Sequence, residues 1–103
     1  MEQGALLLPD DKFVIKNKGV VLILAIIEGV ALIGDYIEFK CDDVTYKKKI
    51  IGIEMMRRGS LFNEIPMHFK QRIGLLIECT DEDEIVKIGK AKLNRDKAIV
   101  YKS

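Results

Sequence analysis

Apolar residues occur along this chain in short runs that either alternate with polar positions or cluster over strand-like lengths, and Gly, Asp and Asn separate the runs. Alternation and enrichment in Val and Ile favour β-strands. The pattern predicts strands at 12–17, 20–28, 35–41, 45–56, 71–79, 90–93 and 98–102. Turn-forming residues predict turns at 17–19, 29–34, 42–43 and 94–96. Almost no segment shows a helical stripe, so the acidic run at 81–84 is interpreted as a solvated loop.

The succession of short strands and turns predicts an all-β fold, a small closed antiparallel β-barrel of six or so strands. Closure removes the exposed strand edges that a strand-rich chain of this size would otherwise present. The chain has 103 residues, which is the size of one domain. We therefore expect residues 1–103 to form a single barrel domain.

The run at 20–27 is apolar at every position, which is unusual for a barrel strand with water on its outer side. Because strand side chains alternate, three residues are expected to face the interior: Leu22, Leu24 and Ile26. The outward set is then Val21, Ile23, Ala25 and Ile27. An apolar outer face of this kind predicts a protein interface.

Several partners could cover that outer face. A second copy of the chain would make the protein a homo-oligomer, and another protein is a further possibility. The chain could also cover itself, with its C-terminal segment at 98–101 or with the irregular segment at 57–69. The function expected first is therefore a non-catalytic interaction module that assembles through this strand.

Basic residues form a second candidate surface, at Lys47, Lys48, Lys49, Arg57 and Arg58. Lys47 and Lys49 are expected on one face of a strand, where both could meet a phosphate backbone. The alternative function is therefore an RNA- or ribosome-binding module. A run of lysines also serves to protect an edge strand from unwanted pairing, and that explanation stays open.

Five blocks of sequence have the order and spacing of a known domain. They are FVI and GVV at 13–21, EGVALIGDYIE at 28–38, IGIEMMRR at 51–58, QRIGLLI at 71–77 and DEIVKIGK at 83–90. Together they resemble the second domain, a β-barrel, of translational GTPases of the elongation factor Tu family. The resemblance implies a barrel fold and a turn near Gly89 into the closing strand. The family's GTPase domain is separate, and none is expected within these 103 residues.

In family members that carry aminoacyl-tRNA, the glutamate of a Gly-x-Glu-Met motif lies at a pocket for the terminal adenosine. Glu54 occupies the matching position, so the resemblance implies a candidate nucleic-acid contact there; a solvated strand glutamate is the alternative. The family often has Thr-Gly-Arg where this chain has Ile23, Leu24 and Ala25, and a tRNA-carrying role is therefore not expected.

Composition and the absence of known motifs limit which ligands and activities are expected. The 17 Lys and Arg balance 16 Asp and Glu, which argues against binding to nucleic acid by bulk charge. The chain lacks the phosphate-loop motif, so no nucleoside triphosphate is expected. With one histidine and no paired cysteine motif, we predict no catalytic residue, no metal, no cofactor and no enzymatic activity. The longest apolar stretch, at 20–33, is too short for a membrane helix, and the expected location is the cytoplasm.

Overall fold

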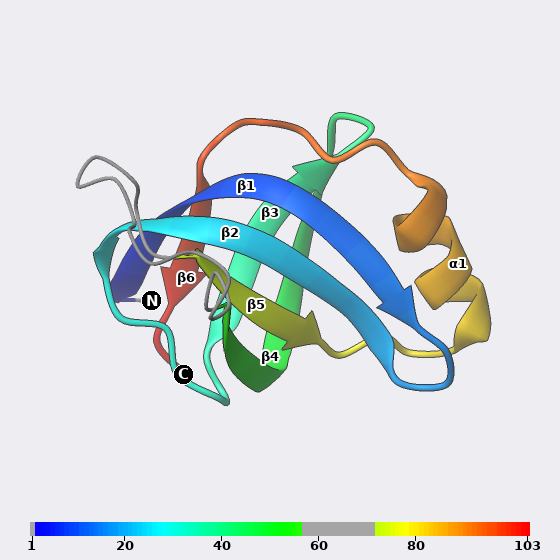
Figure 1. Ribbon diagram of the computed structural model, residues 1–103, viewed down its shortest axis with the longest axis horizontal. Coiled ribbons are helices and arrows are strands. Elements are labelled where there is room, and N and C mark those ends of the chain that lie inside the picture. Colours follow the sequence, from blue (N-terminus) through cyan, green and yellow to red (C-terminus); the bar gives the residue numbers. More distant parts are fainter. Residues whose placement is uncertain (1, 57–71) are drawn as a thin grey trace, which may run out of the picture.

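The computed structural model describes residues 2–56 and 72–103 (Figure 1). Six strands of these residues close into an antiparallel barrel, and a short helix lies at one end of it. In chain order the elements are β1 (Gln3–Ile15), β2 (Gly19–Gly29), β3 (Tyr36–Cys41), β4 (Val44–Met56), β5 (Arg72–Ile77), α1 (Glu82–Lys90) and β6 (Ala98–Tyr101). Around the barrel the strand order is β1-β2-β5-β4-β3-β6. The predicted fold class is confirmed.

The predicted interior of β2 is also confirmed. Leu22 and Leu24 are fully buried, and Ile26 packs against the core. On the neighbouring β5, Leu75 and Ile73 lie opposite Leu22 and Leu24 and are buried with them. The outward phase of the intervening residues follows from this alternation.

β1 begins nine residues earlier than the predicted strand at 12–17, since it starts at Gln3. The sequence Pro9-Asp10-Asp11 has the composition of a turn, which is why the strand was expected to begin after it. Instead, the pairing of β1 with β2 shifts register between Pro9 and Asp11. A β-bulge of this kind absorbs an extra residue and lets one long strand bend around the barrel.

Two predictions near the C-terminus are wrong. The acidic run at 81–84 caps and opens α1, and the predicted strand at 90–93 reduces to an isolated bridge between Leu93 and Cys41. Gly89 lies inside α1, so the turn implied by the resemblance is not found there.

The helix forms because its first turn caps itself. The carboxylate of Asp81 accepts the backbone N–H of Glu84 at 2.9 Å, and that of Glu84 accepts the N–H of Thr80 at 2.8 Å. Such reciprocal bonds satisfy donors that a helix N-terminus otherwise leaves unpaired. Ile85 and Ile88, three residues apart on one face, are buried at the end of the barrel core.

β6 closes the barrel by pairing with β1 on one side and β3 on the other. The segment at 98–101 is therefore a barrel strand and does not cover the outer face of β2. The other internal cover considered, residues 57–69, lies outside the described residues.

Candidate interaction surfaces

The outer face of β2 continues over its neighbours β1 and β5. Directly opposed residues of an antiparallel pair lie on the same face of the sheet. The register therefore builds three outer rows, which together we call the β2 face: Phe13, Val21 and Leu76; Asp11, Ile23 and Gly74; Leu8, Ala25 and Arg72. Ile27 follows on β2 beyond the third row.

The exposed apolar surface of the β2 face lies on β1 as much as on β2. Phe13 is 46% exposed and Leu8 is 40% exposed. Ile23, Ala25 and Ile27 are half-buried. Val21 is only 8% exposed, so it points outward but contributes little free surface. Sequence patterning missed Phe13 and Leu8 because their outward phase depends on the register shift within β1.

Charged side chains flank the apolar rows, with acids on β1 and a base on β5. Arg72 Nη1 lies 3.2 Å from Asp10 Oδ2, and both side chains are partly exposed. Because β2 runs between these two strands and Arg72 points outward, the ion pair spans β2 on its outer side. Asp11, beside Asp10, is exposed in the row of Ile23.

The three lysines of β4 separate onto two faces. Lys47 and Lys49 are exposed on the outer face, which confirms the prediction that they share one. Lys48 lies opposite the buried Ile37, and its ammonium pairs with Glu84 Oε1 at 2.6 Å. The hydrogen bond from Lys48 lowers the pKa of Glu84. Lys48 therefore does not join the other two lysines.

Two tyrosines lie beside Lys47 and Lys49, and they come from other strands. Tyr36 of β3 is opposite Lys49 on one side and Tyr101 of β6 on the other. Lys47 Nζ lies 4.7 Å from the ring centroid of Tyr101. We call this set the lysine–tyrosine face: Tyr36, Lys47, Lys49 and Tyr101. β4 pairs with β5 only from Ile50 onward, so the part of β4 that carries these lysines pairs with β3 alone, and their explanation as edge-strand protection stays open.

Of the remaining predicted nucleic-acid residues, Glu54 is not brought to this face. Glu54 is exposed on β4 opposite Gly74, and so it extends a row of the β2 face. Glu54 lies five positions along β4 from Lys49, which corresponds to roughly 16 Å of strand. Arg57 and Arg58 lie outside the described residues.

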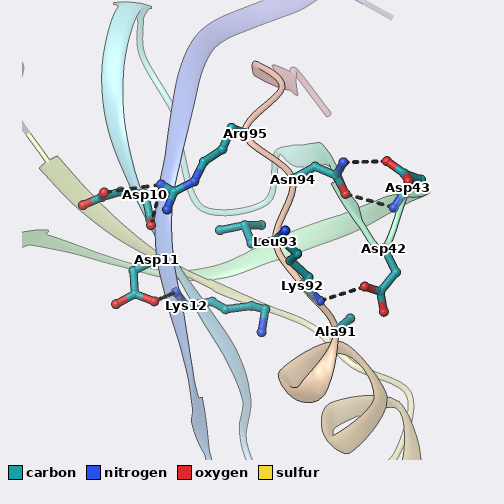
Figure 2. A pocket seen from close by; sticks show the side chains of 10 residues that line it. All are labelled: Asp10, Asp11, Lys12, Asp42, Asp43, Ala91, Lys92, Leu93, Asn94 and Arg95. Atoms are coloured by element: carbon teal, nitrogen blue, oxygen red, sulfur yellow. Dashed lines mark hydrogen bonds and ion pairs between the residues drawn. The ribbon is translucent and has the colours of Figure 1, made fainter.

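A groove of about 600 Å³ lies between β1 and the segment at 91–95, where β6 is too short to continue the sheet (Figure 2). Side chains bridge it in place of a strand ladder. Arg95 Nη1 donates to the carbonyl of Asp10 at 3.0 Å, and Asn94 Nδ2 donates to Asp43 Oδ1 at 2.7 Å. These polar groups bind each other, so we interpret the groove as the place where side chains connect the ends of the barrel wall, and not as a ligand site.

No protein-family model matches this chain, and no curated protein matches it either. Within residues 2–56 and 72–103, no helix is long and apolar enough to cross a membrane. The closed six-stranded antiparallel barrel is the fold that the structure establishes for the chain.

Proposed function

We propose that this chain is a non-catalytic interaction module that binds a protein through the β2 face. The observation that carries the proposal is the set of outward apolar side chains on β1, β2 and β5, among which Phe13 and Leu8 remain 46% and 40% exposed. Contiguous exposed apolar surface rimmed by charge is typical of protein docking sites. Here Asp11 and Arg72 form that rim.

The proposal treats the chain as a relative of the second domain of elongation factor Tu-family GTPases, a domain whose role is binding. The ordered blocks between residues 13 and 90 and the closed barrel support that relationship. Helix α1, at the place of the family's turn into its closing strand, is a departure from the family pattern.

Photo-crosslinking at matched aromatic positions tests the proposal. A benzophenone amino acid replaces Phe13 on the β2 face or Tyr101 on the lysine–tyrosine face, in cells that produce the chain. We expect a nuclease-resistant protein adduct from position 13 that is lost when Ile23→Glu is added, because a charge there disrupts apolar contact. An adduct no stronger at position 13 than at position 101 would overturn the proposal.

A second candidate function, RNA binding, is favoured by the lysine–tyrosine face. Two exposed lysines there adjoin two aromatic rings, and Lys47 Nζ lies 4.7 Å from the ring centroid of Tyr101. Proteins that bind single-stranded nucleic acid combine basic groups with aromatic stacking surfaces in this way. For this function, position 101 would give a nuclease-sensitive adduct instead.

A further inference from the structure

The first half of β4 has a free edge. Residues 44–49 pair with β3, whereas β4 pairs with β5 only from Ile50 onward. Among residues 2–56 and 72–103, no strand pairs with residues 44–49 on the side away from β3. A free edge presents unpaired backbone N–H and C=O groups to any extended chain that approaches it.

Hydrogen bonds at the end of this edge show which backbone groups are free. The N–H of Ile50 donates to the carbonyl of Asp35, just before β3, at 2.8 Å, so Ile50 directs its backbone groups toward the side of β3. These directions alternate along an antiparallel strand, and residues 45, 47 and 49 therefore direct theirs away from β3. The carbonyl of Lys49 accepts the N–H of Glu78 at 2.9 Å, as this phase requires. The backbone groups at 45 and 47 remain for a further strand.

The cap of α1 explains why the ladder between β4 and β5 ends here. Continued from the pair of Ile50 and Ile77, the register would bring Thr80 opposite Lys47. The N–H of Thr80 instead donates to the carboxylate of Glu84 at 2.8 Å. The helix cap thus binds the donor that the carbonyl of Lys47 would otherwise accept.

A groove follows the same edge and makes it accessible. This β4 groove has a volume of about 420 Å³ and is lined by residues 47–49 of β4, residues 78–80 after β5, and Tyr36 of β3. The side chains of Thr45, Lys47 and Lys49 are exposed. A peptide in an extended conformation can therefore reach the free backbone groups.

We infer that the free edge of β4 binds an extended peptide with acidic side chains at alternate positions, which adds to the sheet as a further antiparallel strand. A peptide fits because its own N–H and C=O groups complete the ladder, as in other cases of strand addition. Acidic positions fit because Lys47 and Lys49 share the outer face, where alternate side chains of the added strand lie directly opposite them.

Charge along the edge favours an acidic strand. Lys47 and Lys49 take part in none of the ion pairs found among the described residues. Two acids are near: Glu38 lies on β3, one strand farther from the added peptide, and Glu78 lies at the end of the edge, where the chain after β5 joins β4. The outer side chains directly opposite the added strand are therefore the two lysines and Thr45.

A second copy of the chain does not fit this edge. Two copies that paired through residues 44–49 in antiparallel orientation would bring the lysines at 47 and 49 opposite lysines of the other copy. Like charges directly opposite each other destabilise such a pair. The lysines therefore act against self-pairing and in favour of an acidic partner. This function goes beyond the proposed one, because the β2 face is another part of the barrel.

Fluorescence anisotropy with two designed octapeptides tests the charge preference. One peptide alternates glutamate and threonine, the other alternates lysine and threonine, and both carry the same dye. We expect saturable binding of the acidic peptide and about tenfold or more weaker binding of the basic one. The double variant Lys47→Gln and Lys49→Gln should bind the acidic peptide about fivefold more weakly than the wild type.

Thr45→Pro tests the backbone pairing itself. Proline removes the N–H that faces away from β3 and changes no charge, and edge strands accept proline at such positions. We expect about fivefold weaker binding of the acidic peptide, which corresponds to the loss of one hydrogen bond. Thr45→Val keeps the N–H and should bind as the wild type does.

N-methylated versions of the acidic peptide test the same pairing without any change in the barrel. A glutamate opposite Lys47 directs its N–H at β4 in an antiparallel pair, whereas the neighbouring threonines direct theirs away. N-methylation of the glutamates should therefore abolish binding, and N-methylation of the threonines should preserve it.

Four results would overturn the inference. No binding of the acidic peptide at millimolar concentration would exclude the site, and equal binding of both peptides would contradict the acidic preference. Wild-type affinity in Thr45→Pro, with equal effects of the two N-methylated peptides, would place the peptide elsewhere on the barrel. A single-stranded RNA oligonucleotide that binds through Lys47 and Lys49, without any peptide binding, would assign both lysines to the lysine–tyrosine face alone.

Discussion

The barrel has two outer faces that differ in the chemistry of their side chains, although both cover the same hydrophobic core. Over β1, β2 and β5 the outward rows are apolar in their centre and charged at their rim. Over β3, β4 and β6 one outward row holds Tyr101, Tyr36 and Lys49, and the next holds Ile99, Glu38 and Lys47. The interior beneath both faces is mostly aliphatic, as Leu22 and Ile37 illustrate, with Phe39 and Cys41 of β3 also buried in it. Packing therefore constrains the inward residues of every strand, whereas the outward residues are available for binding.

The two faces also differ in the force that would attach a partner. Apolar contact on the β2 face strengthens or stays constant as salt rises, because screening does not act on it. Contacts of Lys47 and Lys49 with phosphate weaken steeply with salt. The salt dependence of any binding thus indicates which face is used.

The distinction between the inner and the outer side of β2 would be wrong if the outward side chains were also part of the core. Leu24→Ala, on the inner side, should lower the free energy of unfolding by about 2–5 kcal/mol because it leaves a cavity. Ile23→Ala, the adjacent outward position, should cost about 1 kcal/mol, since the side chain is only half-buried. Urea unfolding of the dilute protein measures both, and equal losses would place Ile23 in the core.

The sequence predicts the barrel well wherever alternation is strong. β2, β3 and β4 lie within one residue of their predicted bounds at each end. It fails at 82–90 because only two buried residues, Ile85 and Ile88, mark the helical face, and a four-residue acidic run resembles a loop. The sequence did not predict that β1 begins before Pro9, because the residues around Pro9 have the composition of a turn. In the structure they form a β-bulge within the strand.

The candidate surfaces are predicted only where one strand supplies them. Outward phase on β2 and the shared face of Lys47 and Lys49 follow from alternation within a strand. The tyrosines beside those lysines depend on the pairing of β3 with β4 and β6, which no single segment encodes. Likewise, the engagement of Lys48 depends on a helix that the sequence did not predict.

The lysine–tyrosine face is tested by neutralising the lysines that compose it. If it binds single-stranded RNA through two phosphates, affinity should fall about sevenfold between 50 and 200 mM salt. The double variant Lys47→Gln and Lys49→Gln should remove most of this dependence, because both phosphate contacts are lost. Filter binding of a short RNA at several salt concentrations measures the effect.

Lys48→Gln is the control within the same run of lysines. It removes the same charge but from the inner side of β4, where Lys48 pairs with Glu84. We expect RNA affinity close to that of the wild type. A loss equal to that of the double variant would show that net charge, and not the lysine–tyrosine face, governs binding.

The Lys48–Glu84 pair gives the smallest effect, on the acid stability of the barrel. The two side chains are 16% and 22% exposed, and the pKa of Glu84 is lowered mainly by the hydrogen bond from Lys48. A carboxylate with a lowered pKa stabilises the fold above its unfolded pKa and loses that contribution as pH falls. We expect the pair to contribute about 1 kcal/mol near neutral pH, lost between about pH 5 and pH 3.

Glu84→Gln isolates this charge, because an amide oxygen can still accept the N–H of Thr80 and preserve the helix cap. Urea unfolding at several pH values should show less acid destabilisation in Glu84→Gln than in the wild type. Asp83→Asn, an exposed carboxylate in the same helical turn, is the control and should retain the wild-type pH dependence. If Glu84→Gln also retained it, Lys48 would not be held at the barrel end by this pair. The ion pair would then not be what stabilises the inward position of Lys48 relative to Lys47 and Lys49.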